Sequence, residues 1–145
     1  MKKIVKYFKS TLVGAVLLVA CVASTFAATT QLAASAVHTA TYSTDDQYKG
    51  NAGKGVVVFA KVTVVPGGDT VTFTIEGKDY DGTYYTILAS TAGAGSGTRT
   101  YRVYPGATAS ANLIASDVLP DVWRVTVTHS GVGSFTYSII ANTLE

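Results

Sequence analysis

The stretch that decides the fold is residues 55–65 (GVVVFAKVTVV), which is nearly continuous in β-branched residues. Successive side chains of an extended strand point to opposite faces, and here both faces are apolar until Lys61 introduces a charge. A run that is apolar on both faces is typical of a central strand. We therefore expect residues 55–65 to form a central strand that is covered on both sides at its start and exposed near Lys61.

A turn and a second β run follow directly. Residues 66–69 (PGGD) are strong turn formers, and residues 70–77 (TVTFTIEG) alternate strictly between apolar and polar side chains. The alternation places Val71, Phe73 and Ile75 on the inward face. This pattern predicts a β-hairpin formed by residues 55–77.

Further β runs extend outward from this pair. They cover residues 37–43, 83–89, 98–104, 122–128 and 135–141, whereas residues 112–115 fit either a short strand or a helical turn. After the N-terminal leader no helical periodicity persists for eleven residues. Seven or eight short strands separated by turn signals predict an all-β protein, an antiparallel β-sandwich with jelly-roll or immunoglobulin-like connectivity.

The N-terminus has the three parts of a secretory signal. Four lysines lie in the first nine residues, an apolar run follows from Leu12 to Val22, and small residues end at Ala27. The whole chain has 11 basic and 9 acidic residues, a charge of +2. Without residues 1–27 the charge is 7 − 9 = −2, and the remaining cations form no basic stripe, so we expect no nucleic-acid partner.

We expect residues 1–27 to be a cleaved signal peptide with an apolar leader helix, which exports the protein to the periplasm, the cell surface or the medium. An uncleaved membrane anchor extending to Ala28 is one alternative, although the apolar run is short for a bilayer. A second alternative is lipidation of Cys21, because residues 18–21 (LVAC) resemble a bacterial lipobox. Membrane contact is expected only through this leader or a lipid on Cys21.

The exported part divides into a short linker and one domain. Residues 28–36 (ATTQLAASA) contain one large apolar side chain and fit a flexible linker. Residues 37–145 are long enough for a single β-sandwich with one core. No cysteine follows Cys21, so disulfides do not stabilise this domain.

Catalytic and metal-binding patterns are scarce. His38 and His129 are the only histidines and lack zinc-ligand spacing, and no Gly-x-Ser-x-Gly elbow occurs. Asp79 and Asp81 alternate like calcium ligands, but the later ligands of such a loop are missing, so a turn with solvated carboxylates is the main interpretation and a weak calcium site the alternative. We expect a protein that is not an enzyme and needs no cofactor.

Tyrosine is the remaining surplus, and an amphipathic ring suits contacts with proteins and sugars. Tyr85 and Tyr101 keep phase with inward positions and are expected in the core. Tyr80, Tyr84 and Tyr104 are the candidate binding residues.

Five segments carry a resemblance to a known group of proteins: residues 55–59 (GVVVF), 70–79 (TVTFTIEGKD), 84–89 (YYTILA), 101–106 (YRVYPG) and 119–125 (LPDVWRV). Over about residues 36–141 they resemble small β-sandwich proteins encoded among tailed-phage virion genes, of capsid or decoration type. The resemblance implies a non-enzymatic component of a particle surface. The leader departs from it, because virions assembled in the cytoplasm need no exported subunits.

Two functions are therefore expected from the sequence. The first is an exported, non-catalytic structural or surface-binding module that associates with a protein partner or with itself, on a cell surface or a virion. Long Val/Thr strands with few charges favour such association, because unprotected edges pair with neighbours. The alternative is a secreted or lipid-anchored carbohydrate-binding module that holds a glycan through its exposed tyrosines.

Overall fold

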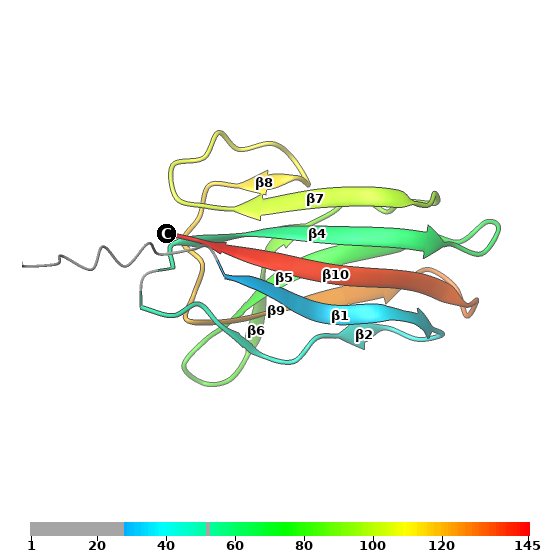
Figure 1. The fold of residues 1–145 in the computed structure, drawn as a ribbon, viewed down its shortest axis with the longest axis horizontal. Coiled ribbons are helices and arrows are strands. Elements are labelled where there is room, and N and C mark those ends of the chain that lie inside the picture. Colours follow the sequence, from blue (N-terminus) through cyan, green and yellow to red (C-terminus); the bar gives the residue numbers. More distant parts are fainter. Residues whose placement is uncertain (1–27, 52) are drawn as a thin grey trace, which may run out of the picture.

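The computed structural model describes residues 28–51 and 53–145 and folds them into two facing β-sheets (Figure 1). In spatial order, sheet A contains β1 (Thr29–His38), β10 (Phe135–Leu144), β4 (Gly55–Val64), β7 (Gly97–Val103) and β8 (Ile114–Ala115). Sheet B contains β2 (Tyr42–Ser43), β9 (Val122–His129), β5 (Val71–Lys78) and β6 (Tyr84–Ala89), and β3 (Gln47–Tyr48) also pairs with β9. The predicted leader helix and Cys21 lie outside the described residues.

The described residues contain no helix, so nothing in them has the length and apolar character of a membrane-spanning helix. The all-β prediction is confirmed. The predicted strand number is too low, because ten strands form when β3 and β8, of two residues each, are included. One pairing is parallel, between β7 and β8.

The strand order is that of a jelly roll. Strands pair from the outside of the sequence inward, β1 with β10, β2 with β9, β4 with β7 and β5 with β6, and all four pairs are antiparallel. Such nested pairing wraps a long hairpin into two sheets of four main strands. The predicted hairpin of residues 55–77 is therefore wrong, because residues 66–69 carry the chain from β4 in sheet A to β5 in sheet B.

The core lies between the two sheets and contains side chains from both. Its largest fully buried members are Trp123 on β9, Tyr137 and Phe135 on β10, and Phe73 on β5. Strand β4 is central, as predicted, and buries Val56, Val57 and Val58 in succession, while Lys61 is exposed. Tyr101 is buried as expected, but Tyr85 is 46% exposed at the end of sheet B, where its ring lies over Gly77.

The predicted linker of residues 28–36 is instead most of a strand. Strand β1 pairs with β10 from Thr29 to His38, and the amide of Thr143 donates a hydrogen bond of 3.2 Å to the carbonyl of Ala28. Pairing with β10, and not the small side chains of this segment, makes it a strand. The predicted first strand, residues 37–43, is also divided, since β1 ends at His38 and β2 begins at Tyr42 in the other sheet.

The sheet edges are protected by geometry rather than by charge. Strands β1 and β6 have register shifts, between Gln31 and Ala36 in the pairing of β1 and at Ile75/Glu76 in the pairing of β6. The other edge strands, β2, β3 and β8, have two residues each. Bulges and short edge strands both hinder pairing with another chain. The edges of both sheets are therefore poorly suited to pairing with another chain.

Candidate interaction surface

The outer face of sheet B carries a network of charged side chains that pair with one another. Arg124 Nε donates to Glu76 Oε2 over 2.7 Å, and the same oxygen accepts the hydroxyl of Thr126 at 2.7 Å. The Arg124 guanidinium also lies 3.4 Å from the centre of the Tyr84 ring. The ring face of Tyr84 is thus covered by a cation–π contact.

The second half of this network joins the segment before β3 to β5 and β6. The Tyr84 hydroxyl and Lys78 Nζ both donate to the carboxylate of Asp46, the latter over 2.8 Å. These bonds, led by that from Lys78, lower the pKa of Asp46, and Asp46 in turn raises the pKa of Lys78. Tyr84, a candidate binding residue from the sequence, is therefore occupied within its own sheet.

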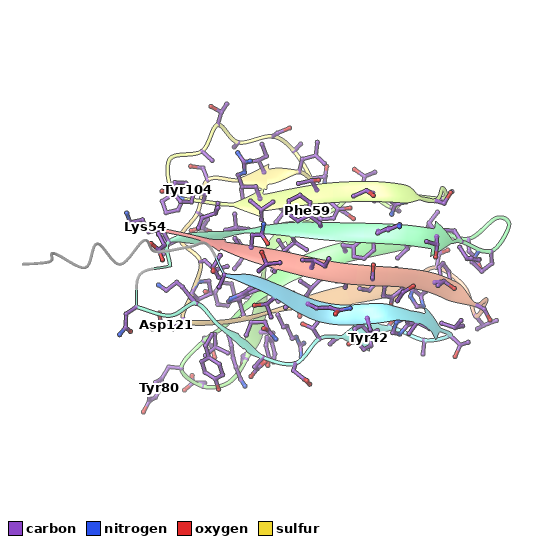
Figure 2. All side chains as sticks on the ribbon, in the orientation of Figure 1. Tyr42, Lys54, Phe59, Tyr80, Tyr104 and Asp121 are labelled. Carbon is purple, nitrogen blue, oxygen red and sulfur yellow. The ribbon has the colours of Figure 1, made fainter. Side chains whose placement is uncertain are left out.

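Tyr80 is fully exposed at the turn between β5 and β6 (Figure 2). Its neighbours in the chain, Asp79 and Asp81, are also exposed. The amide of Thr83 donates to Asp79 Oδ1 over 2.7 Å, and Gly82 closes the turn in the left-handed conformation at φ 85°. No group of three or more potential metal ligands occurs among residues 28–51 and 53–145. The geometry of Asp79 is that of a turn-capping carboxylate.

Tyr104 lies at the same end of the molecule as Tyr80 in Figure 2, but on the side of sheet A. Its hydroxyl donates to the backbone carbonyl of Glu145 over 3.2 Å, and its ring packs over Gly55, where a Cβ atom would come within 2.8 Å of it. The three candidate tyrosines therefore do not form one site. Tyr80 alone presents its whole ring to solvent.

A groove of about 400 Å³ opens between the β6–β7 loop and the turn before β8. Hydroxyl groups line it, on Thr91, Thr98 and Thr100, whereas the hydroxyl of Ser90 is buried, accepts from the amide of Phe73 and donates to the carbonyl of Thr91. Its two stronger hydrogen-bonding groups are engaged internally: Arg99 Nη2 donates to the carbonyl of Gly95 over 2.8 Å and Asn112 Nδ2 to that of Ala89 over 3.0 Å. A volume near 400 Å³ is within the usual range for small-ligand sites.

The end of the interior near the β1–β2 corner holds both histidines. The His38 ring stacks on Tyr137 at 4.3 Å between centroids, and the His129 ring stacks on Phe135 at 4.0 Å. Burial lowers the pKa of both histidines, and for His129 the proximity of His38 lowers it further while Asp69 opposes the shift. Burial also raises the pKa of Tyr137. These histidines are neutral packing groups at neutral pH.

The outer face of sheet A is a broader surface, and the sequence did not single it out. Its side chains alternate with the core residues of β4, β7 and β10 and come together through the strand register. We define this outer face by Val57, Phe59, Lys61, Thr98, Thr100, Arg102, Ser138, Ile140 and Asn142. Phe59 pairs with Ile140 on one side and Thr100 on the other, so an apolar pair lies at its centre.

Charge on this face has one sign. None of the nine acidic residues of the sequence lies in a strand of sheet A, whereas Lys61 and Arg102 project from its outer face. Within the described part of the chain neither cation forms an ion pair or a side-chain hydrogen bond. One signal in the sequence could have indicated this face. Strand β4 and the pair Ile139–Ile140 have apolar side chains on both faces of the strand, so some large side chains must point away from the core.

Comparison with known proteins yields a likeness of fold only. No family model and no curated protein matches the sequence. The structure is similar to the crystal structure of the PBSX exported protein XepA, with a TM-score of 0.53 and 17% identity. The match covers 80% of this chain and 36% of that one, so the present chain spans about a third of the length of the protein it resembles.

A second solved structure, that of infectious bursal disease virus Gx strain, has a TM-score of 0.47 and 13% identity over 81% of this chain and 32% of that one. At these identities the comparisons concern architecture. The two-sheet β architecture of this chain thus occurs in the PBSX exported protein XepA.

Proposed function

We propose that this chain is an exported, non-catalytic structural module of the phage type, which binds a surface or particle through the outer face of sheet A. The observation that carries the proposal is the centre of that face, where exposed Ile140 and half-buried Phe59 lie between the unpaired cations Lys61 and Arg102. Apolar centres rimmed by polar side chains are characteristic of protein-binding surfaces.

Two further features support the proposal. The leader of residues 1–27 has the organisation of an export signal, and the fold is shared with XepA, which is described as a PBSX exported protein. Jelly rolls are used for capsid subunits and for lectins, so the fold itself is compatible with particle or surface binding.

The test replaces the apolar centre while keeping β propensity, in the double variant Phe59→Thr/Ile140→Thr. The exported protein is incubated with purified cell envelopes and with phage particles from the same host, and the fraction that co-sediments is measured. We expect at least a tenfold loss of co-sedimentation. Thr86→Ala, on the outer face of sheet B, is the matched control and should bind as the wild type does. Equal binding by all three proteins would contradict the proposal.

The groove beside β7 favours a second candidate, a carbohydrate-binding module. Its lining hydroxyls suit hydrogen bonds with a sugar, and Leu113 supplies an exposed apolar contact at its rim. A glycan array distinguishes the two functions: glycan binding that is lost in Asn112→Ala and retained in Phe59→Thr/Ile140→Thr would favour the groove. The absence of glycan binding in the wild type would remove this candidate.

A further inference from the structure

The turn between β5 and β6 is a compact projection with an aromatic side chain between two carboxylates. Within this turn, residues 79–82, the amide of Gly82 donates to the carbonyl of Asp79 over 3.1 Å and the amide of Asp79 to that of Thr83 over 2.9 Å. Tyr80 is fully exposed, and the side chain of Asp81 forms no bond within the described part of the chain. A fixed turn loses little entropy on binding.

The outer face of sheet A carries the complementary pattern. Lys61 is two residues beyond Phe59 on β4, so the two side chains share a face about 6–7 Å apart. Arg102 pairs with Val57, two residues on the other side of Phe59. The apolar pair of Phe59 and Ile140 is thus flanked by one cation on each side along the strand direction.

We propose that the residue 79–82 turn of one copy docks on the outer face of sheet A of a second copy. Tyr80 packs against Phe59 and Ile140, and Asp79 and Asp81 lie beside Lys61 and Arg102. Exposed tyrosines serve as anchors of protein interfaces, and charges of opposite sign set orientation and partner choice. This inference rests on the proposed function, since it names the partner that the outer face of sheet A receives.

One copy cannot make this contact with itself. Tyr80 projects from the turn at the end of sheet B, whereas Phe59 lies on β4 in sheet A (Figures 1 and 2). The contact joins two different surfaces, so a pair of copies joined by it retains one unused face on the first copy and one unused turn on the second. Repetition of such a contact produces rings or filaments rather than closed dimers.

The size of the contact sets its strength. A tyrosine and two aspartates bury less surface than the roughly 1,200 Å² of a standard stable interface, so we expect a dissociation constant on the order of 10⁻⁵ to 10⁻⁴ M. Exposed charge pairs are screened by salt, so association should weaken as ionic strength rises. At a surface where copies are concentrated, several such contacts act together.

Sedimentation velocity of the full chain, expressed in bacteria and purified after export, tests the contact over about 10–500 µM and from roughly 0.05 to 0.5 M salt. We expect wild-type protein to form oligomers that increase with concentration and dissociate at high salt. Tyr80→Ala, Lys61→Glu and Asp81→Lys should each weaken association at least tenfold. Tyr48→Ala and Asp117→Lys, at an exposed tyrosine and an exposed aspartate elsewhere, are the matched controls and should associate as wild type does.

Two further arms exclude a merely structural effect. Thermal melts of all variants should agree with the wild type, since every substituted side chain is exposed. The charge-swapped chain Lys61→Glu/Asp81→Lys should recover association to within about threefold of wild type, because turn and face again carry opposite charges. The two single variants change the net charge in opposite directions, so a general effect of net charge would not weaken association in both.

The outcomes separate this inference from the proposed function. The docking of the turn is overturned if the wild type stays monomeric at every concentration. It is also overturned if Tyr80→Ala and Lys61→Glu each self-associate as strongly as the wild type does. If such a protein still co-sediments with envelopes or particles through Phe59 and Ile140, the proposed function stands with a different partner. If the wild type neither self-associates nor co-sediments with envelopes or particles, both the docking of the turn and the proposed function are overturned.

Discussion

The outer faces of the two sheets share strand geometry but differ in how they treat charge. On sheet B, Glu76 lies directly across from Arg124, and Lys78 lies across from Tyr84, which bonds to Asp46. On sheet A, Lys61 lies across from Ser138 and Thr98. Opposite charges at facing positions stabilise a sheet from within, whereas a lone cation contributes to it only through its aliphatic stem.

The difference shows on which face the charged side chains already have partners within the chain. The charges of sheet B are neutralised by neighbours in the same chain, so a partner docking there would have to break existing bonds. The cations of sheet A retain their full bonding capacity for another molecule. The predictions below compare the two faces directly, because substitutions on sheet B should affect folding and those on sheet A should affect association.

The largest difference should come from Glu76→Ala on sheet B. This change leaves the three-quarters-buried Arg124 and the hydroxyl of Thr126 without their shared acceptor, so we expect about 1–3 kcal/mol of destabilisation. Lys61→Ala on sheet A should change stability by less than about 0.5 kcal/mol. Urea denaturation of both variants measures the contrast. Equal destabilisation would show that Lys61 stabilises the fold, and it would contradict the stated difference between the two faces.

Mild acid should destabilise the interior before it affects either face. The pKa values of His38 and His129 are lowered on folding, so the unfolded chain binds more protons below about pH 6.5, and stability falls as pH decreases from that value. The slope cannot exceed about 1.4 kcal/mol per pH unit for each histidine. Asp46, whose pKa is lowered on folding, contributes stability that is lost only as pH falls below its ordinary value of 3.8.

Thermal melts at pH 7.5, 6.5 and 5.5 would measure this interior effect, and His129→Leu is the informative variant. Leucine keeps an apolar group against Phe135 and removes one titrating ring. The variant should therefore lose part of the decline between pH 6.5 and 5.5. If the decline is the same in wild type and variant, His129 does not titrate in this range.

The sequence predicts the strands better than it predicts their partners. Residues 70–77 and 122–128 coincide with β5 and β9 within about one residue, since strict alternation requires one buried face. The same alternation cannot distinguish a hairpin from a corner that joins two sheets, because both place the apolar side chains in one core. The predicted hairpin of residues 55–77 is wrong for this reason.

Strand β1 and the charged network could not be predicted from the sequence, for a related reason. Residues 28–36 have the composition of a linker, and only their pairing with β10 makes them a strand. Tyr84 can be identified as an occupied residue only when Asp46 and Arg124, each about 40 positions away, are known to lie beside it. Exposure of Tyr80, in contrast, follows from its place in an Asp-Tyr-Asp-Gly turn and was predicted.

A smaller effect should distinguish two tyrosines that the sequence grouped together. Tyr84→Phe removes the hydroxyl bond to Asp46 and keeps the ring beneath Arg124, so we expect about 0.5–1.5 kcal/mol of destabilisation. Tyr80→Phe removes a hydroxyl that is surrounded by solvent and should leave stability unchanged. Guanidinium unfolding curves of both proteins decide the matter. A loss in Tyr80→Phe as large as that in Tyr84→Phe would contradict the assignment of Tyr84 alone to the network.

The smallest effect on stability, and the sharpest test of sheet A, should come from Arg102→Met. Val57 points outward beside Arg102 and is nevertheless only 7% exposed, so we infer that the aliphatic stem of Arg102 covers it. Methionine keeps most of that cover and removes the charge, so the unfolding free energy should change by less than about 0.5 kcal/mol. Arg102→Ser uncovers Val57 and should cost more than Arg102→Met. If instead both variants lose the same stability, the charge itself stabilises sheet A, and it is not free to be used by a partner.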